Sequence, residues 1–232
     1  MVNEATDETM GKKPAPGRTR SNDPAAMRAR ILDAAAEAFQ SHGYHSTSTH
    51  DVMRAAGVTG GALHHHFPTK KELAVAVIRE RVARAVEQTW IEPIRSANTA
   101  ARGILGVLEQ IGDGLEDRNV VLGCPLGNLA IELSLAAPDF RDAIQDVFAH
   151  WRRTIAQKLR ADQAAGILPK LDADAFATFV VASYSGSIAL AKAEQAADPL
   201  RTCARQLAAA MHTQARRSDR RRSNRGERTR TI

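Results

Sequence analysis

The sequence is poor in cysteine and in aromatic residues, and each shortage excludes a class of protein. Cys124 and Cys203 are the only cysteines among 232 residues, so a disulfide framework like that of small secreted domains is excluded and a reducing compartment is expected. Aromatic residues make up 4% of the chain whereas alanine is abundant, which favours helix-on-helix packing over a β-sandwich. No long segment alternates apolar and polar residues as half-buried strands do. The sequence therefore predicts an all-α protein.

Long apolar segments are also missing, which argues against secretion and membrane insertion. The first residues include Glu4, Asp7 and Glu8 and lack the apolar stretch of a signal peptide. The most apolar stretch, residues 176–191, contains three serines and a tyrosine. It is also shorter than the roughly 20 residues that cross a bilayer. We expect a buried helix there, in a cytoplasmic protein that has no membrane partner.

Excess positive charge is confined to the end of the chain. The formal net charge is +6, and residues 213–232 carry eight arginines against Asp219 and Glu227, which accounts for all of it. The rest of the chain is formally neutral. The overall charge is therefore weak evidence for nucleic-acid binding, and such a function has to be argued from a motif.

Start and stop signals divide the N-terminal part into short helices. Asp23 caps a first helix that Gly43 ends. A capping box from Ser48 to Asp51 opens a second helix, which ends at Gly57. These signals predict two helices joined by a short loop.

Two further helices follow in the same way. Thr59 opens a short helix over residues 60–66, and Pro68 prevents its continuation. Another capping box begins at Thr69 and opens a long helix to about residue 89. Glycines and prolines then separate further helical segments, which we place at residues 98–115, 125–135, 139–165, 172–195 and 199–211.

Residues 48–66 have the order of a helix-turn-helix: a short helix, a glycine turn and a second short helix. Gly57 can adopt the left-handed backbone that the turn needs. Apolar residues at Val52, Ala56, Val58 and Leu63 would hold the two helices together. The second helix is then free to present small and polar groups to the major groove of DNA.

The sequence around this motif resembles the DNA-binding domain of the tetracycline-repressor (TetR) family. The resemblance covers residues 24 to about 80. The positions that fall at the family's spacing are Ile31, Leu32, Asp33, Ala34, Ala35, Phe39, Gly43, Tyr44, Thr47, Ser48, Asp51, Val52, Ala55, Ala56, Gly57, Val58, Leu63, His65, His66, Phe67 and Lys70. A match of this length is far more specific than a helix-turn-helix alone.

The resemblance implies which residues contact DNA. They are Ser48, Thr49, His50, Thr59, Gly60, Gly61, Ala62, His64, His65 and Lys70, with Lys70 holding a phosphate at a helix N-terminus. Three features depart from the family: His64 stands where tyrosine is usual, Met53 stands where a small alanine is common, and the helix over residues 60–66 has no fixed positive charge. The glycine pair also weakens that helix by about 1 kcal/mol per residue relative to alanine.

The resemblance also implies the domain organisation and the partners. We expect an all-α protein with a disordered arm (1–22), a three-helix DNA-binding domain (23–85), a helical domain for ligand binding and dimerisation (86–212) and a disordered arginine-rich tail (213–232). A homodimer would read two operator half-sites about 34 Å apart. A small inducer would release it from the operator DNA. Repression is the commoner mode of regulation in the family, although a transcriptional activator would have the same sequence features. No cofactor or metal is expected.

Residues 122–133 resemble a subgroup of the family typified by the LmrA/YxaF repressors. The subgroup implies an inducer similar to a drug or a flavonoid. Candidate ligand contacts are Trp90, Leu108, Asn128, Leu129, Glu132, Phe148, Trp151, Phe179 and Tyr184, each of which can equally be an ordinary core residue. Of these, Asn128, Glu132 and Tyr184 would supply the polar contacts.

Cys124 and the histidine run have functional and ordinary interpretations. Cys124 precedes Pro125 at an expected helix start, where the helix dipole would favour a thiolate and a redox role; an inert small residue is the ordinary alternative. Residues 64–66 are three adjacent histidines, but neighbours on a helix point about 100° apart and cannot all ligate one metal ion.

Two other functions fit the sequence less well. An enzyme is disfavoured because the sequence lacks G-x-S-x-G, Walker A and H-E-x-x-H motifs. A helical ligand carrier or scaffold would explain the C-terminal half but leaves the motif at residues 48–66 without a role.

Overall fold

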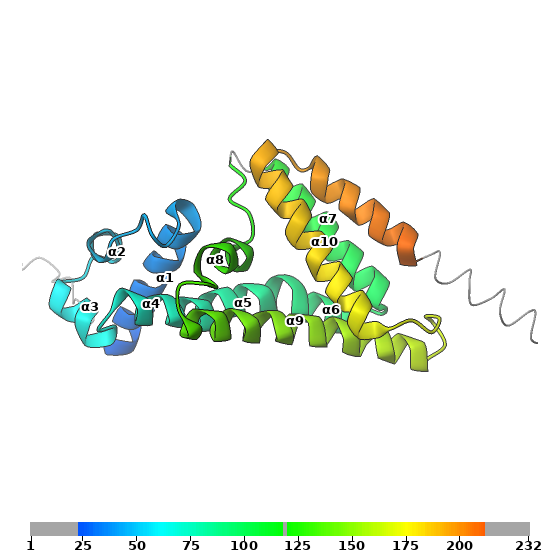
Figure 1. Cartoon of the computed structure of the whole chain (residues 1–232), viewed down its shortest axis with the longest axis horizontal. Helices are drawn as coiled ribbons and strands as arrows, with labels where there is room; N and C mark the ends of the chain where they lie inside the picture. Colours follow the sequence, from blue (N-terminus) through cyan, green and yellow to red (C-terminus); the bar gives the residue numbers. More distant parts are fainter. Residues whose placement is uncertain (1–22, 118–119, 212–232) are drawn as a thin grey trace, which may run out of the picture.

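The structure is a computed structural model that describes residues 23–117 and 120–211 (Figure 1). All regular secondary structure in these two ranges is helical, as the sequence predicts. The expected arm at 1–22 and the expected tail at 213–232 lie outside the described residues.

The first three helices form a compact unit, which we call the head. They are α1 (Pro24–His42), α2 (Thr49–Ala56) and α3 (Gly60–His66), and each begins where the sequence places a cap. The side chain of Asp23 accepts a hydrogen bond from the Ala25 amide, and Ser48 and Asp51 form the reciprocal capping box. The helix bounds in the head therefore follow directly from local capping.

One long helical segment runs from the head along the whole molecule (Figure 1). Its consecutive parts are α4 (Lys70–Val77), η1 (Ile78–Val82), α5 (Ala83–Val86), η2 (Glu87–Ile91) and α6 (Glu92–Ser96). Both η1 and η2 are π-helical turns, in which hydrogen bonds span five residues instead of four. The helix extends past residue 89, where the sequence analysis ended it, and continues through Pro93. Pro93 lies at the start of α6, just after η2, where the change in hydrogen-bond register makes its missing amide tolerable.

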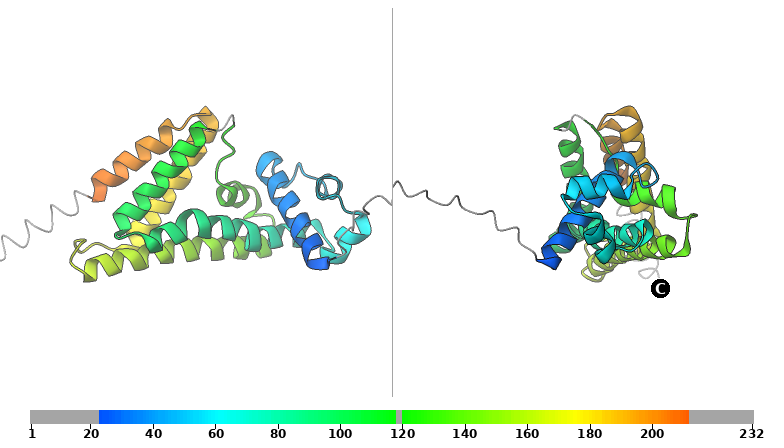
Figure 2. Two further views of the ribbon diagram at one scale, coloured as in Figure 1. Left: turned by 180° about the vertical axis from the view of Figure 1, so that it is seen from behind. Right: turned by 90° about the vertical axis from the view of Figure 1, so that its left-hand side faces the viewer.

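The remaining helices form the core bundle. They are α7 (Ala100–Glu116), α8 (Pro125–Leu133), α9 (Pro138–Ala164), α10 (Ala173–Glu194) and a helix over residues 198–211. Each begins within two residues of its expected start. Helix α9 runs beside the long helical segment, whereas α7, α10 and the 198–211 helix lie at the end opposite the head (Figures 1 and 2). The short helix α8 lies between that group and the head.

Helix α10 contains the most apolar stretch of the sequence. By length and composition alone it could cross a membrane, and 44% of its most apolar window is buried within the protein. It packs chiefly against α9. Its buried residues include Val180, Tyr184 and Ile188, which join the hydrophobic core. Much of the other face of this apolar helix is exposed, and that face is described below.

Candidate DNA-binding surface and regulatory core

The helix-turn-helix of the head is held by the residues that the sequence analysis selected. Gly57 has φ 64° and ψ 39°, the left-handed conformation that glycine adopts without steric cost. Val52 on α2 and Leu63 on α3 are both buried. Thr59 caps α3 by accepting a hydrogen bond from the Ala62 amide. Helix α3 therefore has a fixed orientation relative to α2.

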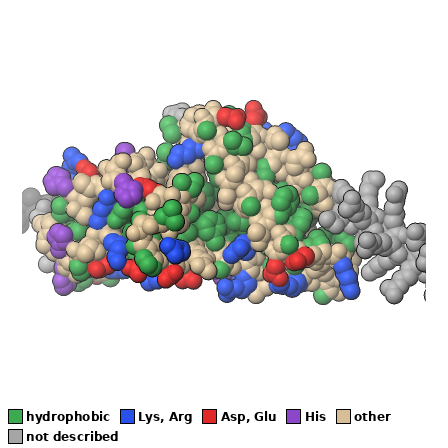
Figure 3. Space-filling view, in the orientation of Figure 1, with side chains coloured by type: hydrophobic (Ala, Val, Ile, Leu, Met, Phe, Trp, Pro, Cys, Tyr) green, Lys and Arg blue, Asp and Glu red, His purple; other side chains and the backbone are tan. Residues whose placement is uncertain are grey.

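The predicted DNA contacts lie on the surface at this end of the molecule. Ser48, His50, Thr59, Gly61, His64 and His65 are exposed, whereas Thr49, Gly60, Ala62 and Lys70 are partly buried. Figure 3 shows histidine side chains gathered over the end that carries α2 and α3. His64 Nδ1 lies 3.4 Å from the Pro68 carbonyl oxygen, so this side chain folds back towards the end of α3. The surface is thus polar and rich in small residues.

Gly60 and Gly61 have no side chains, so nothing projects from one face of α3. A methyl group added at Gly61 would meet no atom within 4 Å, and one added at Gly60 would meet only the Met53 sulfur, at 3.5 Å. Nothing within the described residues therefore requires Gly61 for packing. Because no side chain projects there, another molecule can approach the helix backbone closely.

Lys70 is engaged within the protein in this structure. Its ammonium group lies 4.2 Å from the centre of the Tyr44 ring, and partial burial lowers its pKa while the nearby Glu132 carboxylate raises it. The cation therefore belongs to the junction between the head and the core bundle, as well as to the exposed start of α4.

That junction is built around the carboxylate of Glu132 on α8. Its two oxygens accept hydrogen bonds from the backbone amides of Tyr44 and His45, at 2.9 and 2.7 Å. These amides belong to the loop between α1 and α2. Gly43 permits the approach, because it has φ 84° and any side chain there would begin 3.3 Å from a Glu132 oxygen. A single side chain thus fixes the start of the helix-turn-helix to the core bundle.

A second polar contact lies one turn earlier on α8. The Gln40 amide group donates to the carbonyl of Gly123 at 2.9 Å, and Asn128 donates to the Gln40 side-chain oxygen at 3.4 Å. Asn128 also donates to the Leu122 carbonyl at 2.9 Å, and Lys192 donates to Asn128 at 3.3 Å. Helix α8 is therefore attached both to the head and to α10. We call the contacts of Glu132 and Asn128 with the head the α8 junction.

Ion pairs attach the head to the long helical segment. Arg28 on α1 forms a two-point contact with Glu80 at 2.5 and 2.7 Å, and its hydrogen bonds lower the pKa of the Glu80 carboxyl. The Arg81 Nε lies 2.6 Å from Asp33. Glu80 and Arg81 both belong to the π-turn η1. These ion pairs with η1 and the α8 junction are the polar attachments of the head, which also packs through α1 on α4 and through Tyr44 on Phe140 of α9.

Four aromatic side chains meet in the core bundle, and we call them the aromatic cluster. Trp90 from η2, Trp151 and Phe148 from α9 and Tyr184 from α10 contribute to it. The ring centres of Trp90, Trp151 and Tyr184 lie 4.8 to 5.6 Å apart. Trp151 is fully buried, and its indole nitrogen has no hydrogen-bond partner among the described residues. A buried donor without a partner costs about 1–3 kcal/mol, so an acceptor brought to it would relieve a real penalty.

Of the two interpretations of Cys124, the structure supports the ordinary one, an inert thiol. Cys124 is buried at the start of α8, and burial raises its pKa, an effect that hydrogen bonds from the Gly127 and Leu126 amides and from Tyr184 oppose but do not cancel. The helix start alone favours the thiolate, but removal from water favours the neutral thiol more strongly. The side chain is therefore a neutral thiol in contact with Tyr184.

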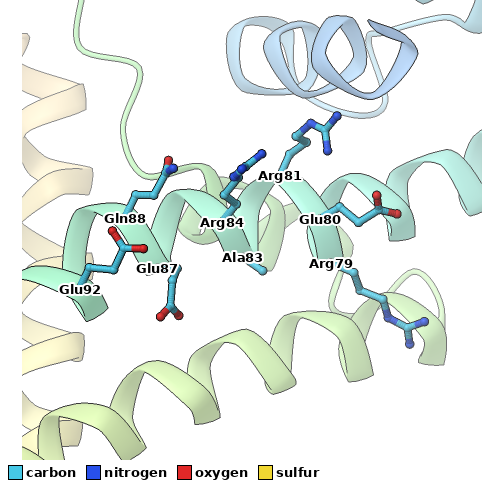
Figure 4. Close-up of a pocket in the computed structure, with 8 residues that line it drawn as sticks. All are labelled: Arg79, Glu80, Arg81, Ala83, Arg84, Glu87, Gln88 and Glu92. Atoms are coloured by element: carbon cyan, nitrogen blue, oxygen red, sulfur yellow. The ribbon is translucent and has the colours of Figure 1, made fainter. Parts of the chain in front are cut away.

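Two open grooves occur on the outside of the long helical segment. Charged side chains line the first one, in which Arg79 and Glu87 point towards α9 whereas Arg81 and Arg84 point to the opposite side (Figure 4). The second adjoins it and is lined by Lys71, Glu72, Val75, Ala76, Arg79, Glu80, Asp139 and Asp142. The lining of both grooves is too highly charged for an apolar ligand.

Helix α10 presents an uncharged stripe to the outside. Its exposed members recur at helical spacing and are Ala175, Thr178, Phe179, Ala182, Gly186, Ala189, Leu190 and Ala193. Phe179 is 48% exposed and Leu190 56% exposed. We call these residues the α10 face.

The structure divides the candidate ligand residues into separate groups. Trp90, Phe148, Trp151 and Tyr184 come together in the aromatic cluster, and Leu108 and Leu129 are buried in the core. Asn128 and Glu132 instead contact the head, and Phe179 lies on the exposed α10 face. Gln40 is not among the site residues predicted from the sequence, and Tyr44 is predicted only as part of the family pattern. Their roles depend on contacts over more than 80 residues of chain, for which no local signal exists.

Comparison with known proteins gives consistent matches for both parts of the chain. A family model described as bacterial regulatory proteins, tetR family, matches residues 31–77, and one described as the C-terminal domain of LmrA/YxaF-like transcriptional regulators matches residues 100–206. The chain is 29% identical over 205 residues to the transcriptional regulator AcuR of Cereibacter sphaeroides, covering 86% of this chain and 92% of that protein. It is 30% identical to the HTH-type transcriptional regulator LmrA of Bacillus subtilis over 134 residues, or 57% and 71% of the two chains. The crystal structure of a TetR transcriptional regulator from Chloroflexus aurantiacus matches with a TM-score of 0.74 and 29% identity, covering 82% of this chain and 96% of that one.

Proposed function

Because the chain belongs to the TetR family of bacterial transcriptional regulators, we propose that it is a repressor that binds a palindromic operator as a homodimer and leaves it when a small hydrophobic inducer binds. The family consists of DNA-binding regulators and not of enzymes. A protein that binds operator DNA acts where bacterial DNA lies, in the cytoplasm.

The exposed surface of α3 carries the proposal of operator binding. Thr59, Gly61, His64 and His65 are exposed on a helix whose orientation is fixed by the turn at Gly57. Such a helix fits the major groove, where small and polar groups read base edges. Two copies related by a twofold axis would place two such helices at half-sites about 34 Å apart.

The α10 face supports the proposed dimer. It is uncharged along several helical turns and exposes the large apolar side chains of Phe179 and Leu190. Small residues such as Ala182 and Gly186 allow a second helix to approach closely. A twofold-related copy would cover this face with the same residues, as a self-complementary interface requires.

The connections of the head suggest how an inducer could act. Ligand binding in the core bundle would shift α8 or the long helical segment, and both contact the head directly. The distance between the two α3 helices of the dimer would then no longer match the spacing of the operator half-sites. A coupling of about 1–3 kcal/mol, which is common in allosteric proteins, changes the affinity 5- to 150-fold.

The direct test is a gel shift with the DNA upstream of the chain's own gene, at about 150 mM salt because electrostatic binding depends on salt. We expect a discrete complex of dimer stoichiometry that survives excess scrambled DNA. If that DNA gives none, selection from a random DNA library follows. A library without any enriched sequence would overturn the proposal and favour a ligand carrier that does not bind DNA.

The substitution Gly61→Ala tests whether α3 enters the groove. Alanine has about 1 kcal/mol more helix propensity than glycine, and the new methyl group has open space in the free protein. We therefore expect the melting temperature to rise by about 2–4 °C. Operator affinity should nevertheless fall about tenfold, because the methyl group would meet the DNA where the surfaces fit closely.

The matched control is Gly106→Ala on α7, which is also an exposed helical glycine with open space around it. It should give a similar gain in stability without loss of operator affinity. Equal affinities for the Gly61→Ala variant and the original protein would contradict the placement of α3 in the groove.

A further inference from the structure

The aromatic cluster contains a hydrogen-bond donor that nothing in the described residues uses. Trp151 is fully buried on α9, and its indole Nε1 has no partner there. Buried polar groups in proteins are nearly always hydrogen-bonded, so an exception inside a cluster of this kind points to a missing acceptor. The described residues do not supply that acceptor, and a bound molecule is one source of it.

The other polar groups of the cluster are already engaged with one another. The Tyr184 hydroxyl interacts with the Trp90 indole and with the Cys124 thiol. The amides of Leu126 and Gly127, at the start of α8, are directed to the Cys124 sulfur. Among the described residues of the cluster, a ligand at this position therefore finds one free donor, the Trp151 indole nitrogen.

The electrostatic surroundings of the cluster favour an uncharged ligand. Cys124 and Tyr184 are both neutral at ordinary pH, because burial raises the pKa of each. Among the described residues Asp162 is the one charged residue that is buried, and its carboxylate is already bonded to the Ala100 amide. A carboxylate or an ammonium group would lose its hydration there without gaining a counter-charge, which is costly.

The shape of the cluster favours a flat ligand. The Phe148 ring lies nearly parallel to the Trp151 indole, with an interplanar angle of 6° and centres 6.4 Å apart. Phe148 is only partly buried, whereas Trp90 and Trp151 are almost entirely so. Rotation of the Phe148 side chain would open a path from solvent, and a planar molecule could then stack on Trp151 in its place.

We propose that the aromatic cluster is the inducer site and that the inducer is a small, flat, uncharged molecule with an acceptor, such as a ketone, ester or amide carbonyl, that bonds to Trp151 Nε1. This inference rests on the proposed function only in taking the ligand to be a regulator. The site is well placed for that role. Cys124 starts α8 beside Tyr184, and Asn128 and Glu132, one and two turns further on, hold the head.

The test uses NMR of the full chain labelled with ¹⁵N-tryptophan. The sequence has two tryptophans, so the spectrum contains two indole N–H signals, and Trp151→Phe identifies which one belongs to residue 151. Three matched probes are added to the free protein without DNA. Acetophenone is flat and carries a neutral acceptor, ethylbenzene lacks the acceptor, and benzoate carries a charged one.

Acetophenone should move the Trp151 indole proton downfield at concentrations up to about 10 mM, the range expected of a ligand of about nine heavy atoms. Ethylbenzene should not produce this downfield shift, and benzoate should leave both signals unchanged. Trp151→Phe keeps an aromatic ring but removes the donor, so it should weaken acetophenone binding about three- to tenfold, equivalent to one hydrogen bond, and leave ethylbenzene binding unchanged.

Several results would overturn the proposal. They are an unmoved Trp151 signal with acetophenone, an equal downfield shift with ethylbenzene, and benzoate binding as tight as that of acetophenone. Because the shifts are measured on the unmutated protein, and Trp90→Phe would assign the two indole signals equally well, the test holds even if Trp151→Phe fails to fold. A failure here would also be distinct from a failure of the proposed function, since operator binding is measured separately and without any ligand.

Discussion

Replacing Gly186 with arginine should convert the proposed dimer into monomers and weaken operator binding at least 100-fold. Gly186 is exposed in the middle of the α10 face, and a side chain there would meet no atom within 4 Å of its first carbon in the single chain. The variant should therefore fold normally as a protomer. In a dimer, two arginines would face each other across a twofold axis and lose their hydration, which a stable interface does not tolerate.

The size of the expected effect follows from the loss of the second half-site. Linking two binding modules raises the apparent affinity by about 10²–10⁴, and a monomer loses this gain. Light scattering after gel filtration would give the mass in solution, and gel shifts would give the affinity. Gly106→Arg is the matched control, because it adds the same charge at another exposed helical glycine. A Gly186→Arg protein that stays dimeric would show that α10 does not form the interface.

Removing the carboxylate of Glu132 should abolish most of the response to an inducer. In Glu132→Ala the amides of Tyr44 and His45 lose their acceptor, and the loop before α2 is no longer fixed to α8. Hydrogen bonds to a charged group contribute about 1.5–3 kcal/mol each when buried. These two are partly accessible to water, so we expect an overall loss of stability of about 2 kcal/mol.

The functional expectation for Glu132→Ala is more specific than the loss of stability. Operator affinity without inducer should change by no more than a few-fold, because α3 and its supports are untouched. The weakening of operator binding by inducer should fall to within about threefold, since an allosteric coupling of about 1–3 kcal/mol passes through this contact. Glu109→Ala, at an exposed position on α7, should retain the full response. An intact response in Glu132→Ala would show that the coupling does not depend on this contact, and it would favour the long helical segment as the connection between inducer site and head.

Features of the fold that depend on local chemistry could be predicted from the sequence. Asp23, Ser48, Thr59 and Thr69 cap helices where the sequence places them, and Gly57 has the left-handed conformation assigned to it. Capping and glycine conformation involve neighbours within four residues, so the sequence contains all the information needed. The same holds for the helix-turn-helix, whose apolar residues are close together in the chain.

The ligand candidates could be predicted only as a set of suitable residue types. Trp90, Trp151 and Tyr184 do come together, but Glu132, a polar residue chosen for the same site, contacts the head instead. A carboxylate on a helix has no local signal that tells a pocket from a junction 87 or 88 residues away. The exposure of Phe179 has the same origin, since a helix that is apolar on all sides does not reveal which face a second chain would cover.

The two π-turns give the long helical segment a tolerance to changes in length. A π-turn holds one residue more than the α-helical turn that could replace it. Loss of one residue within η1 or η2 could therefore convert that turn to ordinary helix, and the faces on both sides would keep their partners. The same loss within α4 would rotate everything beyond it by about 100° and separate Arg28 from Glu80. Related regulators could thus differ in length by a residue here while keeping the head in the same orientation, and the π-turns mark the positions where such differences would accumulate.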